Sequence, residues 1–456
     1  MQRLLENDLT KWKDSPVRKP LLLLGARQVG KTWLMQYFGQ NHYENMVYIR
    51  LDRNERMRRI FEESSYNMPE LLLLMQAESG IKIEAGKTLI ILDEIQDCPA
   101  ALTSLKYFCE DIPEHHVMAA GSLLGVKQHH GTGFPVGKVN TMTLYPMSFR
   151  EFMMASGHAF DLEFITQKKW GSVRLIADRL IHQLKLYYYI GGMPEVVSTY
   201  LRTEDFSEVR RVQHEILSNY ANDFSKHVPA LLSAKLSLLW DSVPEQLSRE
   251  NKRFIYKDVK PDMRARDLES AMDWLRRAGL IYRVERINEP ALPIGAYRDG
   301  AFKLYFLDVG LLGAKCELEI STILEKNAIF REFKGALTEQ FVQQELRAES
   351  SLTPHYWQSE KARAEIDFII QAFMNIVPIE VKAEHNTKAK SMVTYCKKYH
   401  PAMAIRVSMN DHAQHYLDTG QESKTILLDL PLYASFMLEE ISRDILSDLR
   451  QNQNPA

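Results

Sequence analysis

The first 120 residues alternate short apolar runs with segments of helical periodicity. Leu34 and Phe38 repeat at helical spacing after the first run, and a charged helix is expected at residues 53–63. Strands that alternate with helices in this way form parallel sheets. The pattern therefore predicts an α/β fold, with buried strands at residues 21–24, 46–52, 89–92 and 117–120.

The first apolar run, Leu21–Leu24, leads directly into a glycine-rich loop. The loop matches G-x-x-x-x-G-K-[ST], and its glycines let backbone N–H groups converge on phosphate oxygens. The Lys31 ammonium would face the β- and γ-phosphates, the Thr32 hydroxyl would bind Mg²⁺, and the dipole of the following helix favours an anion. We therefore predict that ATP and Mg²⁺ are bound by Gly25, Ala26, Arg27, Gln28, Val29, Gly30, Lys31, Thr32 and Trp33.

A pair of acids follows the third apolar run. Asp93 and Glu94 would lie at the carboxyl end of a buried parallel strand, where open α/β sheets bind ligands. Asp93 is expected to hold the Mg²⁺ shell, and Glu94 to orient and activate the attacking water. Ser122 follows the next strand and would lie near the γ-phosphate, although an ordinary Gly-Ser turn explains it equally well. Lys31, Glu94 and Ser122 are thus the predicted catalytic residues.

The composition narrows the class of protein. At 456 residues the chain is too long for one ordinary core, and 45% hydrophobic with 25% charged residues is typical of globular proteins. A net charge of −2 argues against a globally basic nucleic-acid-binding protein but leaves a local basic patch open. The four separated cysteines fit a reducing compartment, no apolar stretch is long enough to span a bilayer, and the charged N-terminus is unlike a signal peptide. We expect a cytoplasmic protein without a membrane partner.

Two further motifs lie beyond the acidic pair, LYPMSFREFM at residues 144–153 and YYIGGMPEVV at residues 188–197. Together with GARQVGKT and LIILDEIQ, they resemble a prokaryotic family of AAA-type ATPases that carry a C-terminal DUF4143-like domain of unknown function. The resemblance covers nearly the whole chain and implies ATP hydrolysis. It also implies that Gly192 and Pro194 belong to a helical lid near the adenine, whereas the residues alone indicate only a break between two helices. Arg150 is a candidate arginine finger.

A locally basic stretch follows the helical pattern of residues 161–230. The helix expected at Arg264–Ala278 ends at Gly279 and precedes a strand. This order resembles a winged helix with Arg264–Ala278 as the recognition helix, which would bind DNA. Alternatively, the module packs on the ATPase and its charges form a solvated face. The basic residues are Arg249, Lys252, Arg253, Lys257, Lys260, Arg264 and Arg266.

The last 150 residues contain a second set of candidate catalytic residues. Residues 355–370 and 376–384 are expected to form a β-hairpin. Alternation along the strands would bring Asp367 and Glu380 together, with Lys382 on the same face as Glu380. Two carboxylates and a lysine can support Mg²⁺-assisted hydrolysis of a phosphodiester.

This arrangement resembles the PD-(D/E)xK nucleases in their Holliday-junction-resolvase-like form. The resemblance implies Glu339 as the helical acid, Asp367 as the first strand acid and Glu380-Val381-Lys382 as the E-x-K motif. No Pro precedes Asp367, as is also the case in resolvases. The alternative is a nuclease fold that serves only as an interaction platform, with an ordinary charged ladder on its strands.

These patterns divide the chain into an ATPase core (1–160), a helical lid (161–230), a winged-helix-like module (231–300) and a nuclease-like α/β domain (301–456). The leading hypothesis is an AAA-type ATPase whose hydrolysis switches a C-terminal half that acts on DNA. The alternative is a nucleotide-dependent switch in which an inactive nuclease-like domain docks onto a protein partner. A homo-oligomer is a further expected form of assembly. A third hypothesis, a small-molecule kinase, lacks an evident acceptor pocket.

Overall fold

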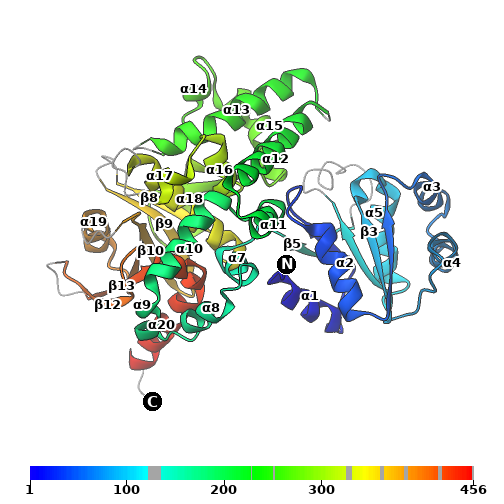
Figure 1. The fold of residues 1–456 in the computed structure, drawn as a ribbon, viewed down its shortest axis with the longest axis horizontal. Helices are drawn as coiled ribbons and strands as arrows, with labels where there is room; N and C mark the ends of the chain where they lie inside the picture. Colours follow the sequence, from blue (N-terminus) through cyan, green and yellow to red (C-terminus); the bar gives the residue numbers. More distant parts are fainter. Residues whose placement is uncertain are drawn as a thin grey trace. The chain divides into compact units, whose positions relative to one another are not determined.

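The computed structural model describes residues 1–121, 135–226, 228–249, 252–324, 331–359, 364–384, 389–419 and 424–453. The chain forms two compact units, one of residues 1–145 with 277–280 and one of residues 146–276 with 281–456. Each unit is built on its own sheet (Figure 1). Within the described ranges, no helix has the length and apolar character that a membrane span requires.

A five-stranded sheet, whose paired strands all run parallel, forms the centre of the first unit. Its strands are β1 (Leu21–Leu24), β2 (Asn45–Arg50), β3 (Thr88–Asp93), β4 (His116–Ala120) and β5 (Asn140–Thr143). The strand order is β2-β3-β4-β1-β5, so β4 separates the strand before the glycine-rich loop from the strand before the acidic pair. The predicted parallel α/β fold of the N-terminal part is therefore confirmed.

Helices of the first unit alternate with these strands along the chain, as the sequence predicts. They are α1 (Leu5–Asp14), α2 (Lys31–His42), α3 (Glu55–Glu63), α4 (Met68–Ser79), the 3-10 turn η1 (Ile95–Asp97) and α5 (Pro99–Glu110). Met57, Leu71 and Leu105 from α3, α4 and α5 join Ile90 of β3 in one buried core. Burial of this apolar face holds the sheet and fixes the carboxyl ends of its strands.

The second unit contains a mixed sheet of eight strands in the order β12-β13-β11-β10-β9-β8-β6-β7. Its strands are β6 (Ile281–Ile287), β7 (Arg298–Phe306), β8 (His355–Gln358), β9 (Glu365–Ala372), β10 (Asn375–Val381), β11 (Met403–Ser408), β12 (Ala413–Leu417) and β13 (Thr425–Pro431). Strands β10, β11 and β13 are parallel, whereas β9 pairs antiparallel with both β10 and β8.

Along the chain, the helices of the second unit precede, separate and follow the strands of this sheet (Figure 1). They are α7 (Phe149–Ala155), α8 (Ala159–Thr166), α9 (Trp170–Leu175), α10 (Ala177–Ile190), α11 (Pro194–Thr203), α12 (Phe206–Lys226), α13 (Ala230–Ser248), α14 (Tyr256–Val259), α15 (Ala265–Arg277), α16 (Val309–Lys315), α17 (Ile320–Leu324), α18 (Arg331–Glu349), α19 (Lys390–Tyr399) and α20 (Leu438–Gln453), with 3-10 turns η2 (Ile294–Tyr297) and η4 (Leu432–Met437). Helices α10 and α12 contact α16, and α18 contacts α13, α16, β7 and β10.

The C-terminal sheet differs from the predicted hairpin. The sequence predicts one strand over residues 355–370, but the structure has two, β8 and β9, which pair antiparallel. Ser359 N–H also donates to the Ala364 carbonyl at 2.8 Å. Residues 285–287 of β6 also pair with residues 355–357 of β8. The sheet thus continues across residue 300, where the sequence suggests a domain boundary. The sequence does not reveal this continuation, because pairing between distant segments leaves no local pattern.

Candidate functional site

The glycine-rich loop between β1 and α2 is tightly curved and closely packed. A Cβ on Gly25 would lie 2.3 Å from the Leu144 carbonyl oxygen, so only glycine fits there. Gln28 adopts a φ of 64°, a left-handed conformation that is strained for a non-glycine residue and recurs at ligand sites. Arg3 Nη1 donates to the Val29 carbonyl at 2.8 Å and fixes the loop from the N-terminal segment.

The ammonium of Lys31 lies against this loop. Its Nζ donates to the carbonyl oxygens of Gly25 at 3.0 Å and Ala26 at 2.8 Å. Burial lowers the pKa of Lys31 to about 8, against the opposing attraction of Glu94 and Asp93. A phosphate group beside Nζ would stabilise the charged form, so Lys31 is suited to hold an anion at the start of α2.

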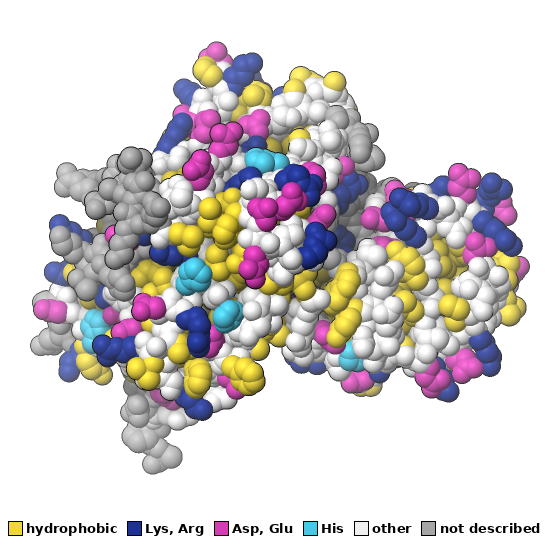
Figure 2. All heavy atoms as spheres, viewed as in Figure 1, with side chains coloured by type: hydrophobic (Ala, Val, Ile, Leu, Met, Phe, Trp, Pro, Cys, Tyr) yellow, Lys and Arg dark blue, Asp and Glu magenta, His cyan; other side chains and the backbone are white. Residues whose placement is uncertain are grey.

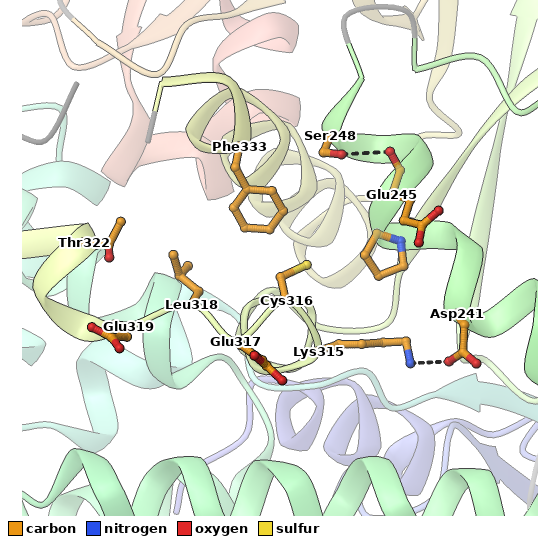
Figure 3. Close-up of a pocket in the computed structure, with 11 residues that line it drawn as sticks. Asp241, Glu245, Ser248, Lys315, Cys316, Glu317, Leu318, Glu319, Thr322 and Phe333 are labelled. Atoms are coloured by element: carbon orange, nitrogen blue, oxygen red, sulfur yellow. Dashed lines mark hydrogen bonds and ion pairs between the residues drawn. The ribbon is translucent and has the colours of Figure 1, made fainter. Parts of the chain in front are cut away.

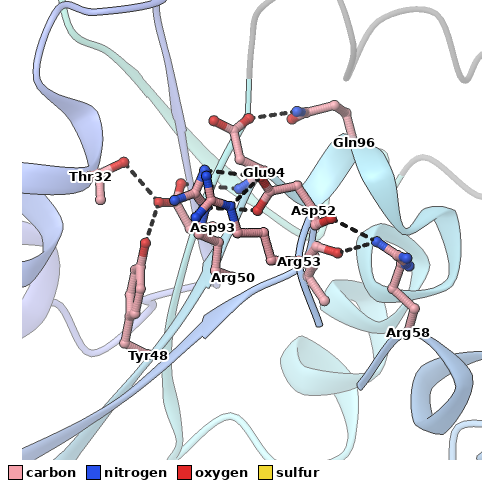
Figure 4. Close-up of polar contacts among 10 residues, drawn as sticks. Thr32, Tyr48, Arg50, Asp52, Arg53, Arg58, Asp93, Glu94 and Gln96 are labelled. Atoms are coloured by element: carbon pink, nitrogen blue, oxygen red, sulfur yellow. Dashed lines mark hydrogen bonds and ion pairs between the residues drawn. The ribbon is translucent and has the colours of Figure 1, made fainter. Parts of the chain in front are cut away.

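Asp93 collects three hydrogen bonds at the end of β3 (Figure 4). Its Oδ2 accepts from the Thr32 hydroxyl and from the Tyr48 hydroxyl, each at 2.8 Å, and its Oδ1 accepts from Glu94 N–H at 3.0 Å. The Thr32 hydroxyl and the Asp93 carboxylate therefore meet at one point. These two oxygen groups fit the Mg²⁺ of a bound nucleotide, which takes oxygen ligands and keeps several waters.

Glu94 follows in a left-handed conformation with φ 53°. Its Oε2 accepts from Gln96 Nε2 at 2.6 Å (Figure 4). Tyr48 and Gln96 were not among the predicted residues. Tyr48 comes from β2, and its place beside Asp93 can be recognised only when the strand order is known. Gln96 lies two residues beyond Glu94, and this closeness in sequence is the only feature that could have pointed to it.

The other predicted nucleotide-binding residues occupy different surroundings. Ala26 and Val29 are buried, whereas Trp33 is 41% exposed and stacks on Tyr37 with ring centroids 4.8 Å apart. Ser122 lies outside the described residues.

A second polar cluster gathers on one face of the C-terminal sheet. Phe368 of β9 pairs with Ile379 of β10, so the adjoining Asp367 and Glu380 share the opposite face. Asp367 Oδ2 accepts from Val381 N–H at 2.8 Å, and Lys382 Nζ lies 2.8 Å from Glu380 Oε1.

Glu339 of α18 joins this face through a hydrogen bond with Asp367. Two further lysines, which the sequence analysis did not assign to this site, contact it. Lys303 of β7 is fully buried, with Nζ 2.5 Å from Glu365 Oε1 and 3.6 Å from Glu339 Oε2. Lys252, which precedes α14, forms an ion pair with Glu339. The signal for Lys303 is a lysine within the apolar run of residues 301–306. The basic segment around Lys252 indicated DNA binding instead.

Burial and charge set the proton affinities in this cluster. Burial raises the pKa of Asp367, and the neighbouring Glu339 raises it further. At Glu339 the same burial is outweighed by Lys252 and Lys303, which lower its pKa. Burial lowers the pKa of Lys382, but Glu380 and Asp367 outweigh it and raise that pKa overall.

Metal binding by this cluster is restricted in the conformation observed. Glu380 is 3% exposed, and its Oε2 has no hydrogen-bond partner among the described residues. An unpaired buried carboxylate oxygen is costly and suits a cation or water. Nevertheless, the described residues include no group of three or more His, Cys, Asp or Glu side chains placed to hold a metal ion.

The motifs at residues 144–153 and 188–197 meet inside the second unit. A Cβ on Gly192 would lie 2.0 Å from the Met147 carbonyl oxygen, and Met147 N–H donates to the Gly192 carbonyl at 2.7 Å. Gly192 N–H also donates to the buried Asp308 Oδ2 at 2.6 Å. Pro194 begins α11 after the predicted break between helices. These contacts explain the motif by packing, and a place near the adenine stays a prediction.

Two buried carboxylates of α18 cap the start of α7. Glu345 Oε1 accepts from Phe149 N–H at 2.8 Å, and Glu349 accepts from the Ser148 hydroxyl. Burial raises the pKa of Glu349 to about 7. The Arg150 Nη1 atom is 3.8 Å from Glu349 Oε2, and its role as an arginine finger stays a prediction.

The basic segment has the element order predicted for a winged helix. Helices α13, α14 and α15 are followed by the antiparallel pair β6 and β7. Leu268, Met272 and Leu275 of α15 are buried, whereas the Arg266 side chain is 77% exposed. Figure 2 shows acidic and basic side chains interspersed over the visible face of the molecule. Contact of this segment with DNA stays a prediction.

A cavity of about 810 Å³ lies elsewhere in the second unit (Figure 3). Its wall includes Asp241 and Glu245 of α13, and Lys315 Nζ lies 2.6 Å from Asp241 Oδ1. Leu318 and Phe333 supply apolar surface. None of the predicted site residues lines this cavity.

The loop, the acidic pair and the parallel sheet define the first unit as a P-loop nucleotide-binding fold. Residues 17–153 match the family described as AAA domain, residues 181–322 match a domain of unknown function, DUF8612, and residues 334–433 match a second, DUF4143. The chain thus contains an AAA domain of the P-loop type and a C-terminal DUF4143 domain, as the sequence motifs predict.

Several solved structures share low identity with the chain. A Walker-type ATPase of Pyrococcus abyssi is 14% identical, with 68% of this chain and 95% of that chain covered and a TM-score of 0.42. The Orc1 protein of Aeropyrum pernix, solved in complex with DNA, is 12% identical, with 71% and 95% covered and a TM-score of 0.29. Cdc6p of Pyrobaculum aerophilum is 14% identical, with 70% and 93% covered and a TM-score of 0.25. None of the curated proteins matches the chain.

Proposed function

We propose that the first unit hydrolyses ATP with Mg²⁺. The observation that supports this most directly is the meeting of the Thr32 hydroxyl and the Asp93 carboxylate beside the P-loop. When bound, Mg²⁺ would neutralise charge on the β- and γ-phosphates. Thr32 and Asp93 are the residues of this chain that would hold it, with Tyr48 orienting the Asp93 carboxylate.

Glu94 is the proposed group that orients the attacking water. Its carboxylate follows directly on Asp93 and accepts a hydrogen bond from Gln96. An ionised carboxylate accepts several hydrogen bonds, so Glu94 can accept from a water while Gln96 holds its Oε2, and Gln96 is the proposed positioning residue for Glu94. Lys31 would leave the carbonyl oxygens of Gly25 and Ala26 to contact phosphate oxygens.

Paired variants separate binding from turnover. Lys31→Ala should weaken ATP binding, whereas Glu94→Gln should bind ATP as the wild type does and lose at least 100-fold in turnover, roughly the contribution of a positioned base. Nucleotide binding is followed by calorimetry and turnover by phosphate release. Wild-type turnover by Glu94→Gln would rule out this role for Glu94.

For the second unit, we favour action on nucleic acid over docking alone. The supporting observation is the shared face of Asp367, Glu380 and Lys382, which Glu339 approaches from α18. In this reading the carboxylates would hold a divalent cation, and Lys382 would stabilise developing negative charge. Unpaired Glu380 Oε2 fits such a cation.

Cleavage assays distinguish this proposal from docking alone. Asp367→Ala should abolish Mg²⁺-dependent cleavage of branched or duplex DNA and leave ATP hydrolysis unchanged. Asp299→Ala, at a carboxylate on β7 that pairs with Arg286, is the matched control. If the wild type cleaves no DNA while ATP hydrolysis is intact, the nuclease-like unit is a docking platform for a protein partner or a second copy of the chain.

A further inference from the structure

The carboxylate cluster of the second unit is contacted by a lysine from outside its own strands and helix. Lys252 forms an ion pair with Glu339, and its side chain is 13% exposed. The other two lysines of the cluster, Lys303 and Lys382, lie on or directly after sheet strands. Lys252 instead lies in the segment between α13 and α14, so it can leave the cluster without breaking the sheet.

Backbone hydrogen bonds fix the chain directly after Lys252. Phe254 N–H donates to the Phe302 carbonyl at 2.8 Å, and Ile255 N–H donates to Gln246 Oε1 at 2.7 Å. The backbone is thus anchored, whereas the long Lys252 side chain can change rotamer. Exposed Arg253 and Lys257 lie close in sequence, so a phosphodiester backbone bound by them would also attract Lys252.

The balance of charges in the cluster indicates that Lys252 occupies the place of a cation. Four carboxylates, those of Glu339, Glu365, Asp367 and Glu380, are accompanied by the ammonium groups of Lys252, Lys303 and Lys382. Without Lys252, the two remaining ammonium groups leave one negative charge when Asp367 keeps the proton that it shares with Glu339, and two when Asp367 is ionised. A divalent cation would offset either excess of negative charge. Lys252 and a divalent cation are therefore alternative partners for Glu339.

We propose that Lys252 is an autoinhibitory internal cation, which blocks divalent-metal binding by Glu339 until nucleic-acid phosphates draw it away. This inference rests on the proposed action of the second unit on nucleic acid. It also accounts for the lack of a metal-holding group in the described residues, because the ion pair with Lys252 occupies the Glu339 carboxylate.

Manganese binding to the full-length protein tests this proposal without any cleavage assay. Calorimetry with Mn²⁺, in the absence of nucleotide, should show binding at least tenfold tighter for Lys252→Met and Lys252→Gln than for the wild type. Lys252→Arg, which keeps the charge, should bind as the wild type does. Lys257→Met is the matched control because Lys257 is an exposed lysine of the same basic segment. Adding Glu339→Gln to Lys252→Met should remove the gain.

The outcomes separate this proposal from the proposed nuclease function. Tighter Mn²⁺ binding by the Lys252 variants without any DNA cleavage would support the block of metal binding by Lys252 and reject nuclease activity. Equal Mn²⁺ affinity of the wild type, Lys252→Met and Lys252→Gln would overturn the proposal even if the wild type cleaves DNA. Thermal melting identifies any variant that fails to fold. In that case, metal-free DNA binding by Glu339→Gln decides, because release of Lys252 should strengthen it severalfold and unchanged affinity would overturn the proposal.

Discussion

The lowered pKa of Lys31 predicts an unusual pH dependence of nucleotide affinity. Free Lys31 loses its proton near pH 8, and a bound triphosphate would raise this pKa because it stabilises the ammonium. Binding therefore takes up protons above pH 8, and affinity falls as the pH rises. If the pKa in the complex exceeds 10, the protonated fraction of the free protein implies a loss of about 25-fold in affinity between pH 7.5 and 9.5.

The assay is calorimetric titration with ATP in EDTA, which prevents turnover. The pH range begins at 7.5 so that ionisation of the γ-phosphate contributes little. Lys31→Arg is the control because a guanidinium stays charged over this range, so its affinity should be nearly independent of pH even if it is weaker. A wild-type affinity that stays constant from pH 7.5 to 9.5 would refute the reasoning about Lys31.

Three further predictions follow from the buried and basic residues and the nucleotide site. The raised pKa of Glu349, about 7 against 4.5 ordinarily, contributes stability that is present below pH 4.5 and lost as the pH rises through 7. Glu349→Gln should therefore raise the free energy of unfolding above pH 8 by up to about 3 kcal/mol relative to the wild type, measured by urea titration; no gain at pH 8.5 would contradict it. Charge reversal of Arg264 and Arg266 should weaken DNA binding and flatten its dependence on salt, with a change in slope of about 2 if both contact phosphates, whereas reversal of exposed Arg53 and Arg59 in the first unit should not. Tyr48→Phe removes one hydrogen bond to Asp93 and should reduce Mg²⁺-dependent turnover by a few-fold with little change in metal-free ATP affinity; an equal loss in both would mean that Tyr48 acts on nucleotide binding.

The sequence was sufficient for features that depend on neighbouring residues. Four leucines followed by the P-loop motif predicted β1 and the start of α2, and alternation in β9 and β10 was enough to place Asp367 and Glu380 on one face. Local periodicity carries this information because the residues of one strand or helix share one backbone geometry.

The sequence analysis missed features that depend on pairing between distant segments, because local periodicity describes only one strand or helix at a time. Lys303 and Lys252 contact Glu339 from β7 and from the segment before α14, and no spacing rule connects these positions. Tyr48 contacts Asp93 because β2 and β3 are neighbours in the sheet, and strand order cannot be read from periodicity. The left-handed backbone of Gln28 and Glu94 is likewise imposed by the folded loop, since neither residue type favours it.

The central claim, that the first unit hydrolyses ATP through Glu94, is tested most directly by a single-turnover measurement. Excess protein is loaded with radiolabelled ATP in EDTA, Mg²⁺ is added, and the conversion of bound ATP to ADP is followed by rapid quenching. We predict that the wild type converts its bound ATP and that Glu94→Gln still holds at least half of its ATP unhydrolysed after a hundred wild-type half-lives. Conversion at the same rate in both proteins would contradict the claim.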